Sequence, residues 1–284
     1  MEAPRHDTRG IVDPSGLLTR VRFRRHEPAE PLRRYVEWYW LIDWDLPTPY
    51  ASHIVPHPAV NLTFQWDEDE GPPCGEVTGV ALGLYTRKLT GQGRVCGVKF
   101  RPGGFRPYTP EASVSRWTGR ALPAQEVFPQ ATGDAAHAIV TPADDHARVA
   151  ALDAFLHALP CTPDPQADLA TALVRHIRAD RTVRRVGDFA RAQGLSVRAL
   201  QRLFAMYVGV SPKWVILRYR IHEALEHAGT RTDVDWATLA TELGYADQAH
   251  LVRDFTATVG VPPTAYAAEA GAGEARAGEA RAGG

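Results

Sequence analysis

Two copies of one pattern decide the fold of this chain: DFARAQGLSVRALQRLFAMYVGVSP from Asp188 to Pro212, and TLATELGYADQAHLVRDFTATVGVPP from Thr238 to Pro263. Each copy predicts a helix, a glycine turn, a second helix and a closing Gly-x-x-Pro. A helix-turn-helix unit places its second helix in the major groove, so two units indicate sequence-specific binding to double-stranded DNA. The matched positions are Ala190 with Ala240, Gly194 with Gly244, Leu200 with Leu251, Arg202 with Arg253, Phe204 with Phe255 and Gly209 with Gly260.

The second helix of each copy carries polar residues opposite its apolar positions. In the first copy Ser196 is predicted to cap this helix, which leaves Arg198, Gln201 and Arg202 on the outer face. Arginine can donate two hydrogen bonds to guanine and glutamine can form two with adenine. Such residues are also common on surface helices that bind nothing, and the repeat favours the DNA-binding interpretation. The candidate DNA-binding residues are Ser196, Arg198, Gln201, Arg202, Lys213, Gln248, His250 and Arg253.

One long helix is predicted between the two copies. Ser211 and Pro212 form a strong helix start, because serine caps a helix and proline fits its first position. After Pro212, no glycine or proline interrupts the sequence up to Ala228. Eighteen residues of helix span ~27 Å, against ~34 Å between successive major-groove faces. We expect this stiff helix to present both second helices to one face of the duplex.

Charge is distributed unevenly between the two copies. The range 175–220 holds eleven basic and two acidic residues, whereas 221–266 holds two basic and seven acidic residues. Neutralisation of phosphates supplies much of the affinity for DNA. We therefore expect the first copy to carry most of the electrostatic binding, with the second binding more weakly or mainly supporting the first.

Composition gives no sign of export or of a membrane segment. The 284 residues contain 32 Lys and Arg against 33 Asp and Glu, so net charge alone gives no indication of nucleic-acid binding. The three cysteines are far apart and include no C-x-x-C pair, which fits a reducing compartment. The polar N-terminus lacks the apolar segment of a signal peptide, and no stretch reaches eighteen apolar residues. We expect a cytoplasmic protein without a membrane span.

The texture of the chain changes from strand-like to helical along its length. Strand patterns fill Tyr35–Trp44, Val60–Trp66, Gly75–Gly83 and Arg94–Arg101, with Gly91 and Gly93 read as the turn before the last of them. The fold class is α+β, with a barrel-like or sandwich-like N-terminal domain and an all-α C-terminal domain. The predicted parts are a flexible arm at 1–20, a β-rich regulatory domain with a helical end at 21–160, a linker at 161–167, a DNA-binding domain at 168–267 and a disordered tail at 268–284.

The stretch from Val186 to Tyr266 resembles the DNA-binding domain of AraC/XylS-type regulators. The resemblance is carried by SVRALQRLF (196–204), GVSP (209–212), LATELGY (239–245) and GVPP with Tyr266. It implies seven helices, two helix-turn-helix units and a linking helix that act in transcription control. The partners expected besides double-stranded DNA are a small-molecule effector, RNA polymerase and a second copy of the chain.

The N-terminal half resembles an uncharacterised domain that is often fused to AraC-type regulators. The segments VPHPAVNLTF (55–64) and GVKFRPGGFRPY (97–108) carry this weaker resemblance. It implies a regulatory or effector-binding role, with no defined ligand. Dimerisation is an alternative role for the same half.

Four tryptophans, Trp38, Trp40, Trp44 and Trp66, make the N-terminal half unusually aromatic. They line a pocket for a small apolar or cationic ligand, or they fill a β-core. His53 and His57 flank Ile-Val-Pro but have no third partner, so no metal site is expected. The glycines of FRPGGF (100–105) make a tight turn or cradle an anion.

The chain lacks the common catalytic motifs. It contains no G-x-S-x-G, H-E-x-x-H, Walker loop or G-x-G-x-x-G, so we assign no catalytic residue and no cofactor. The main hypothesis is a sequence-specific transcription regulator. The alternative is a small-molecule-binding or enzymatic N-terminal domain attached to a helical domain that only tethers it to DNA.

Overall fold

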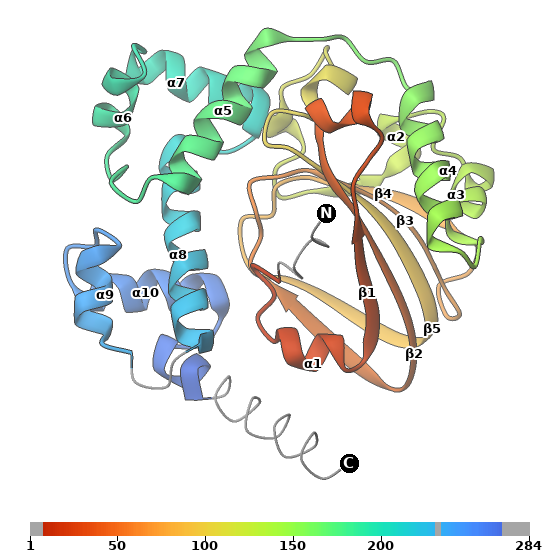
Figure 1. Cartoon of the computed structure of the whole chain (residues 1–284), viewed down its shortest axis with the longest axis horizontal. Helices are drawn as coiled ribbons and strands as arrows, with labels where there is room; N and C mark the ends of the chain where they lie inside the picture. The colour runs from red at the N-terminus through yellow and green to blue at the C-terminus, as the bar shows by residue number, and fades with distance from the viewer. Residues whose placement is uncertain (1–7, 231–233, 269–284) are drawn as a thin grey trace.

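The N-terminal half is built on one antiparallel sheet, shown in the computed structural model of the chain, which describes residues 8–230 and 234–268 (Figure 1). Within these ranges the strand order is β1-β2-β5-β3-β4-β6. The C-terminal half is helical and lies beside the sheet. The strands are β1 (Val21–His26), β2 (Val36–Ile54), β3 (Asn61–Asp67), β4 (Cys74–Thr78), β5 (Tyr85–Phe100) and β6 (Ala121–Pro123).

The sheet is open, so the expected barrel or sandwich detail is corrected. In the described residues β1 pairs only with β2 and β6 only with β4, and no second sheet packs against the first. The first edge strand has six residues and the last has three. The α+β class, with a β-rich first half and a helical second half, is confirmed.

One face of the sheet packs against helices. Successive residues of a strand point to opposite faces, and Tyr39, Leu41 and Phe64 are fully buried on the helix side. They contact α3 (Gly133–Val140) and α4 (Asp145–Ala158), which cover that face in Figure 1. This packing forms the main apolar core of the N-terminal half.

A buried arginine ties α4 to the sheet. Arg148 is 2% exposed, and it donates to Asp43 Oδ1 at 2.7 Å and to the Pro142 carbonyl at 2.6 Å. Arg24 bridges the carboxylates of Asp43 and Asp145. Because a buried charge is tolerated only with close partners, this network fixes where α4 begins.

Two tryptophans lie flat across glycines of the neighbouring strand. Trp40 is paired with Gly97 and Trp44 with Gly93 between β2 and β5. A Cβ at either glycine would lie 2.0 Å from the indole ring. The sequence predicted a turn at Gly91 and Gly93, but β5 runs through both. Gly91, at φ +51°, instead meets the bulge between Leu46 and Tyr50.

Residues 8–18 differ from the expected flexible arm. The helix α1 (Pro14–Leu18) buries Leu17, and Ile11 bridges Ile54 at the end of β2. The Gly10 carbonyl accepts a hydrogen bond from the Val55 N–H. These contacts fold the segment over the sheet. Residues 1–7 and the predicted tail from 269 onward lie outside the described ranges.

The helical half contains both predicted helix-turn-helix units. They are α6 (Val186–Ala192) with α7 (Val197–Leu203), and α9 (Trp236–Glu242) with α10 (Gln248–Val259). Helix α5 (Pro165–Ala179) precedes them, α8 (Pro212–Thr230) joins them, and residues 263–268 are also helical. The second helix of the first unit, α7, ends earlier than expected, at Leu203, and the chain continues as a π-helical turn, η4 (Phe204–Val208), before Gly209.

The tryptophan–glycine pairs give a stability prediction. Gly97→Ala should lower the free energy of unfolding by about 1–3 kcal/mol, because the methyl group overlaps the Trp40 indole. Urea unfolding followed by circular dichroism measures the change. The control is Gly83→Ala, since a Cβ at Gly83 meets nothing within 4 Å. Equal stability of both variants would contradict this packing.

Candidate functional site

The outer face of α7 is free to meet a ligand. Arg198, Gln201 and Arg202 are exposed, whereas Leu200 and Leu203 on the opposite face are buried. Ser196 caps the helix as predicted, and its hydroxyl accepts from the Ala199 N–H at 3.1 Å. The structure therefore brings the three polar side chains together at one end of the helical half.

The outer face of α10 is exposed but more acidic. Gln248 and Arg253 reach solvent, while His250 touches the Tyr245 ring edge-on at 5.2 Å and lies 3.8 Å from Asp254. Asp247 caps the helix by accepting from the His250 N–H at 2.7 Å. The carboxylates of Asp247 and Asp254 therefore lie beside the candidate DNA-binding positions of the second unit.

Helix α8 holds the two units on one side of the molecule. In Figure 1 the α6–α7 and α9–α10 pairs both project from α8 away from the sheet. The helix has nineteen residues, which corresponds to ~28 Å of rise. This arrangement is compatible with the expected rod that spaces two reading helices.

Only some of the eleven basic side chains in the range 175–220 can bind an anion such as a DNA phosphate. Arg218 and Arg220 are buried, and three others have carboxylate partners: Arg178 with Glu37, Arg181 with Glu223 and Arg191 with Asp188. The sequence count therefore overstates the charge that phosphates can meet. Arg231 and Asp233 of the second range lie outside the described residues. The other exposed cations of the range 175–220 are Arg175, Arg184, Arg185, Arg198, Arg202 and Lys213, of which Arg198 and Arg202 lie on α7.

A cavity of about 220 Å³ lies on the other face of the sheet from α3 and α4. Trp38, Trp40 and Trp44 alternate along β2 and line it, with Phe23 from the paired strand β1. Leu17 of α1 also contributes to the lining. The aromatic wall matches the predicted pocket for three of the four tryptophans.

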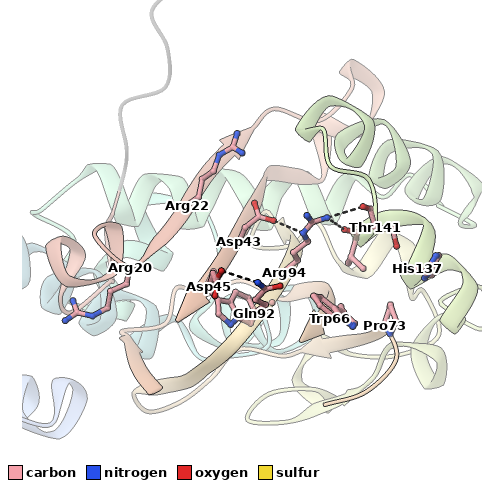
Figure 2. Close-up of a pocket in the computed structure, with 13 residues that line it drawn as sticks. Arg20, Arg22, Asp43, Asp45, Trp66, Pro73, Gln92, Arg94, His137 and Thr141 are labelled. Carbon is pink, nitrogen blue, oxygen red and sulfur yellow. Dashed lines mark hydrogen bonds and ion pairs between the residues drawn. The ribbon is translucent and has the colours of Figure 1, made fainter. Parts of the chain in front are cut away.

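The fourth tryptophan, Trp66, lies elsewhere. It is paired with Arg94 on β5 and so belongs to the opposite face of the sheet. It lines a different hollow of about 730 Å³, drawn in Figure 2, where Pro73 and Arg94 lie nearby. The expectation that four tryptophans share one pocket therefore fails for Trp66, because strand alternation separates positions 40 and 66.

The charged groups that line the cavity are all basic or titrate as bases. Arg9, Arg25, Arg87 and Lys99 contribute to its wall, as does His57, and no aspartate or glutamate does so among the described residues. Trp38 lies between two of the cations, with Lys99 Nζ 4.0 Å and the Arg25 guanidinium carbon 4.5 Å from the ring centroid. Neutral polar groups from β3 complete the wall: Asn61, Thr63 and Gln65.

Comparison with protein families identifies two domains. Residues 189–269 match a helix-turn-helix domain family, and residues 24–123 match a domain of unknown function, DUF6597. The C-terminal region is an AraC-type helix-turn-helix domain. This finding confirms the predicted resemblance and makes the chain a DNA-binding transcription regulator.

Solved structures of ToxT from Vibrio cholerae are similar over most of the chain. An apo form shares 13% identity at a TM-score of 0.38, covering 81% of this chain and 96% of that one. A form bound to an unsaturated fatty acid shares 12% at 0.39, covering 85% and 96%. A form bound to (E)-4-(8-methylnaphthalen-1-yl)but-3-enoic acid shares 10% at 0.42, covering 88% and 99%. None of the curated proteins is significantly similar to this chain.

The AraC-type domain is docked on the N-terminal half through α8. The Arg218 side chain, 5% exposed, donates to the Leu82 carbonyl at 2.8 Å, and Arg9 forms an ion pair with Glu226. Near the start of α8, the Thr118 hydroxyl donates to the Gly209 carbonyl at 2.6 Å. Contacts therefore run along the whole length of the linking helix.

Two stacked imidazoles lie at the centre of this interface. The rings of His57 and His222 are 4.3 Å apart and nearly parallel. His222 Nε2 lies 3.2 Å from the Pro56 carbonyl and must donate to it, while Nδ1 has no partner. Burial, together with nearby cations, lowers the pKa of His222 to about 3. The pair is therefore neutral at physiological pH.

The other candidates from the sequence have structural roles. His53 Nδ1 lies 2.9 Å from the Thr86 hydroxyl, so His53 is not part of the stacked pair. The described residues hold no group of three His, Cys, Asp or Glu side chains that could bind a metal ion. The FRPGGF segment is a turn against Tyr35 and α5, where a Cβ at Gly104 would lie 2.1 Å from the Tyr35 carbonyl oxygen. No helix in the described ranges has the length and apolar character required to cross a membrane.

Sequence reasoning missed the cations of the cavity. Arg25 and Lys99 lie directly across from Trp40 and Trp38 in the β1–β2 and β2–β5 pairings. Alternation along each strand places a residue on a face, but the pairing between strands is needed to bring these side chains together. The stacking of His57 on His222 was not foreseen either, because it joins the loop after β2 to the linking helix.

The charge difference between the two units gives a binding prediction. Arg202→Ala should weaken DNA binding about tenfold and reduce the slope of log Kd against log salt by about one, more than Arg253→Ala does. Fluorescence anisotropy with a labelled duplex over a salt series measures both. Arg22→Ala is the control, because this exposed arginine lies on β1 of the sheet. A larger loss with Arg253→Ala would reverse the ranking of the two units.

The buried imidazole gives a pH prediction. The folded-state pKa of His222 is below its unfolded value of about 6.5, so the unfolded chain binds more protons as the pH falls. The stability from this group is complete above about pH 6.5 and should fall by on the order of 2 kcal/mol by pH 5. Urea unfolding at a series of pH values should show a flatter profile in His222→Gln than in wild type. The exposed His146 provides the control His146→Gln, and an unchanged profile in His222→Gln would refute the assignment.

Proposed function

We propose that this protein is a sequence-specific regulator. Its helices α7 and α10 read adjacent major grooves, and its N-terminal cavity senses a small apolar effector. The observation that carries the proposal is the pairing of two exposed reading helices with one joining helix that is buried against the cavity-bearing domain. The DNA side and the cavity side of the molecule therefore share α8.

The reading residues are proposed from exposure and chemistry. Arg198, Gln201 and Arg202 are the base-reading side chains of the first unit, and Lys213 and the capped end at Ser196 meet phosphates. In the second unit the proposed reading side chains are Gln248, His250 and Arg253, of which Arg253 matches Arg202 in the repeat. Asp254 beside His250 reduces the affinity of this unit for phosphate. The second unit therefore contributes more to the choice of DNA sequence than to the affinity for DNA.

The effector is proposed from the cavity itself. Its aromatic wall of Trp38, Trp40 and Trp44 favours an apolar body, and the polar side chains of β3 can orient it. The cavity floor reaches His57, which stacks on His222 of α8. A ligand there can bias how the linking helix is held, which is what a sensor requires.

The remaining assignments follow from the family of the C-terminal domain. We expect a non-catalytic protein that acts in the cytoplasm, contacts RNA polymerase at its promoters and functions as a homodimer. The N-terminal domain is the part of the chain proposed to mediate dimerisation as well as sensing.

Footprinting tests the proposal directly. With the full chain and the DNA upstream of its own gene, we expect one discrete protected site that spans two adjacent major grooves. Protection should require about tenfold more protein with Arg202→Ala and be unchanged with Arg22→Ala. Binding that is only salt-sensitive and uniform along the DNA would instead favour the alternative of a tethering domain.

A further inference from the structure

The cation Lys99 connects the cavity to a single carboxylate. Its ammonium lies on the cavity wall, 4.0 Å from the Trp38 ring centroid and 3.1 Å from Glu37 Oε2. The two side chains are only 8% and 14% exposed. Burial lowers the pKa of Lys99 while Glu37 opposes that change, so the ammonium depends on a nearby anion.

The same carboxylate reaches the DNA-binding half. Glu37 Oε1 lies 3.5 Å from a terminal guanidinium nitrogen of Arg178 in α5. Helix α5 packs its Leu173, Val174 and Ile177 into the apolar cluster that contains Phe189 and Leu200 of the first helix-turn-helix unit. Glu37 therefore joins a cavity residue to the helix that supports that unit.

The backbone explains why Glu37 can make both contacts. The β2–β5 register shifts between Val36 and Trp38, so Glu37 is the extra residue of a bulge. A bulge interrupts strict alternation and turns a side chain away from its expected direction. Glu37 is in this way aimed along the sheet towards Lys99 and α5 rather than into the helix-side core.

Arg9 and Arg87 of the cavity wall have carboxylate partners, Glu226 for Arg9 and Asp67 and Glu70 for Arg87, and the carboxylate beside Lys99 is Glu37. The lining residues of the cavity include four cations and no carboxylate, and its remaining wall is aromatic or neutral. A ligand with an apolar body and one carboxylate satisfies both features, because charge-assisted hydrogen bonds are strong in a buried site. When bound to Lys99, the carboxylate of the ligand would occupy the position that the Glu37 carboxylate holds in this structure.

We propose that the effector is an apolar carboxylic acid whose carboxylate binds Lys99 in place of Glu37, and that Glu37 then pairs with Arg178 alone. The displaced carboxylate holds α5 more firmly against the N-terminal domain and so transmits ligand binding to the first helix-turn-helix unit. This inference rests on the proposed sensing function and adds the ligand class and the route of coupling.

The test uses the full chain with decanoate as probe and decan-1-ol as its neutral match. Calorimetry should show decanoate binding about tenfold more tightly than decan-1-ol, and Lys99→Met should remove that preference. Decanoate should slow amide hydrogen exchange in α5 and change the affinity for the footprinted duplex. Equal binding of the two probes, or no binding of decanoate, would overturn the ligand class while footprinting still tests DNA recognition.

Two substitutions test the route of coupling. Glu37→Gln should bind decanoate at least as tightly as wild type, because the resident competitor is removed. Glu37→Gln and Arg178→Gln should both lose the decanoate effect on α5 exchange and on DNA affinity. Glu76→Gln, on a half-buried carboxylate bonded to Thr78, and Arg175→Gln, on an exposed arginine of α5, are the matched controls. A full decanoate response in Glu37→Gln would overturn the route, and the α5 exchange readout decides this without DNA.

Discussion

The structure depends on the burial of one side of α8 against the N-terminal domain. Arg218 and His222 are both deep in that interface, and each satisfies a backbone carbonyl of the other half, that of Leu82 and that of Pro56. A helix that carried only the two DNA-reading units would have no reason to bury an arginine and a histidine. The position of the reading helices is therefore set by the fit between the two halves as well as by the helical domain itself.

That fit is continuous with the apolar cores. Val55, at the end of β2, packs in the same cluster as Leu251 and Phe255 of the second unit, and Val80 packs with Leu200 and Phe204 of the first. Each unit thus belongs to an apolar cluster that also includes a buried side chain of the N-terminal half. Packed interfaces of this kind shift between discrete arrangements rather than deforming continuously, so a small change at the cavity wall can be passed on as a change of docking.

The local features of the helical half were readable from the sequence because they depend on neighbours within one turn. The caps at Ser196 and Asp247 and the start of the linking helix at Pro212 follow from residue preferences at helix ends. The sheet was less predictable because its key contacts join strands far apart in the chain. The packing of Trp40 on Gly97 can be predicted only when the β2–β5 register is known. The alternation of apolar and polar residues does not reveal the bulge at Glu37.

The two helix-turn-helix units differ in charge, and this difference determines how docking on the N-terminal half can affect DNA binding. The first unit holds the exposed Arg198 and Arg202 and is proposed to supply most of the phosphate affinity, while Asp247 and Asp254 flank the candidate DNA-binding positions of the second. A weak second unit adds binding energy only when it is presented at the correct spacing, because a misplaced unit must pay for reorientation from its own small gain. Since Arg9 and His57 grip α8 at Glu226 and His222, on the half of the helix nearer the second unit, the N-terminal domain acts where control of presentation has the greatest effect.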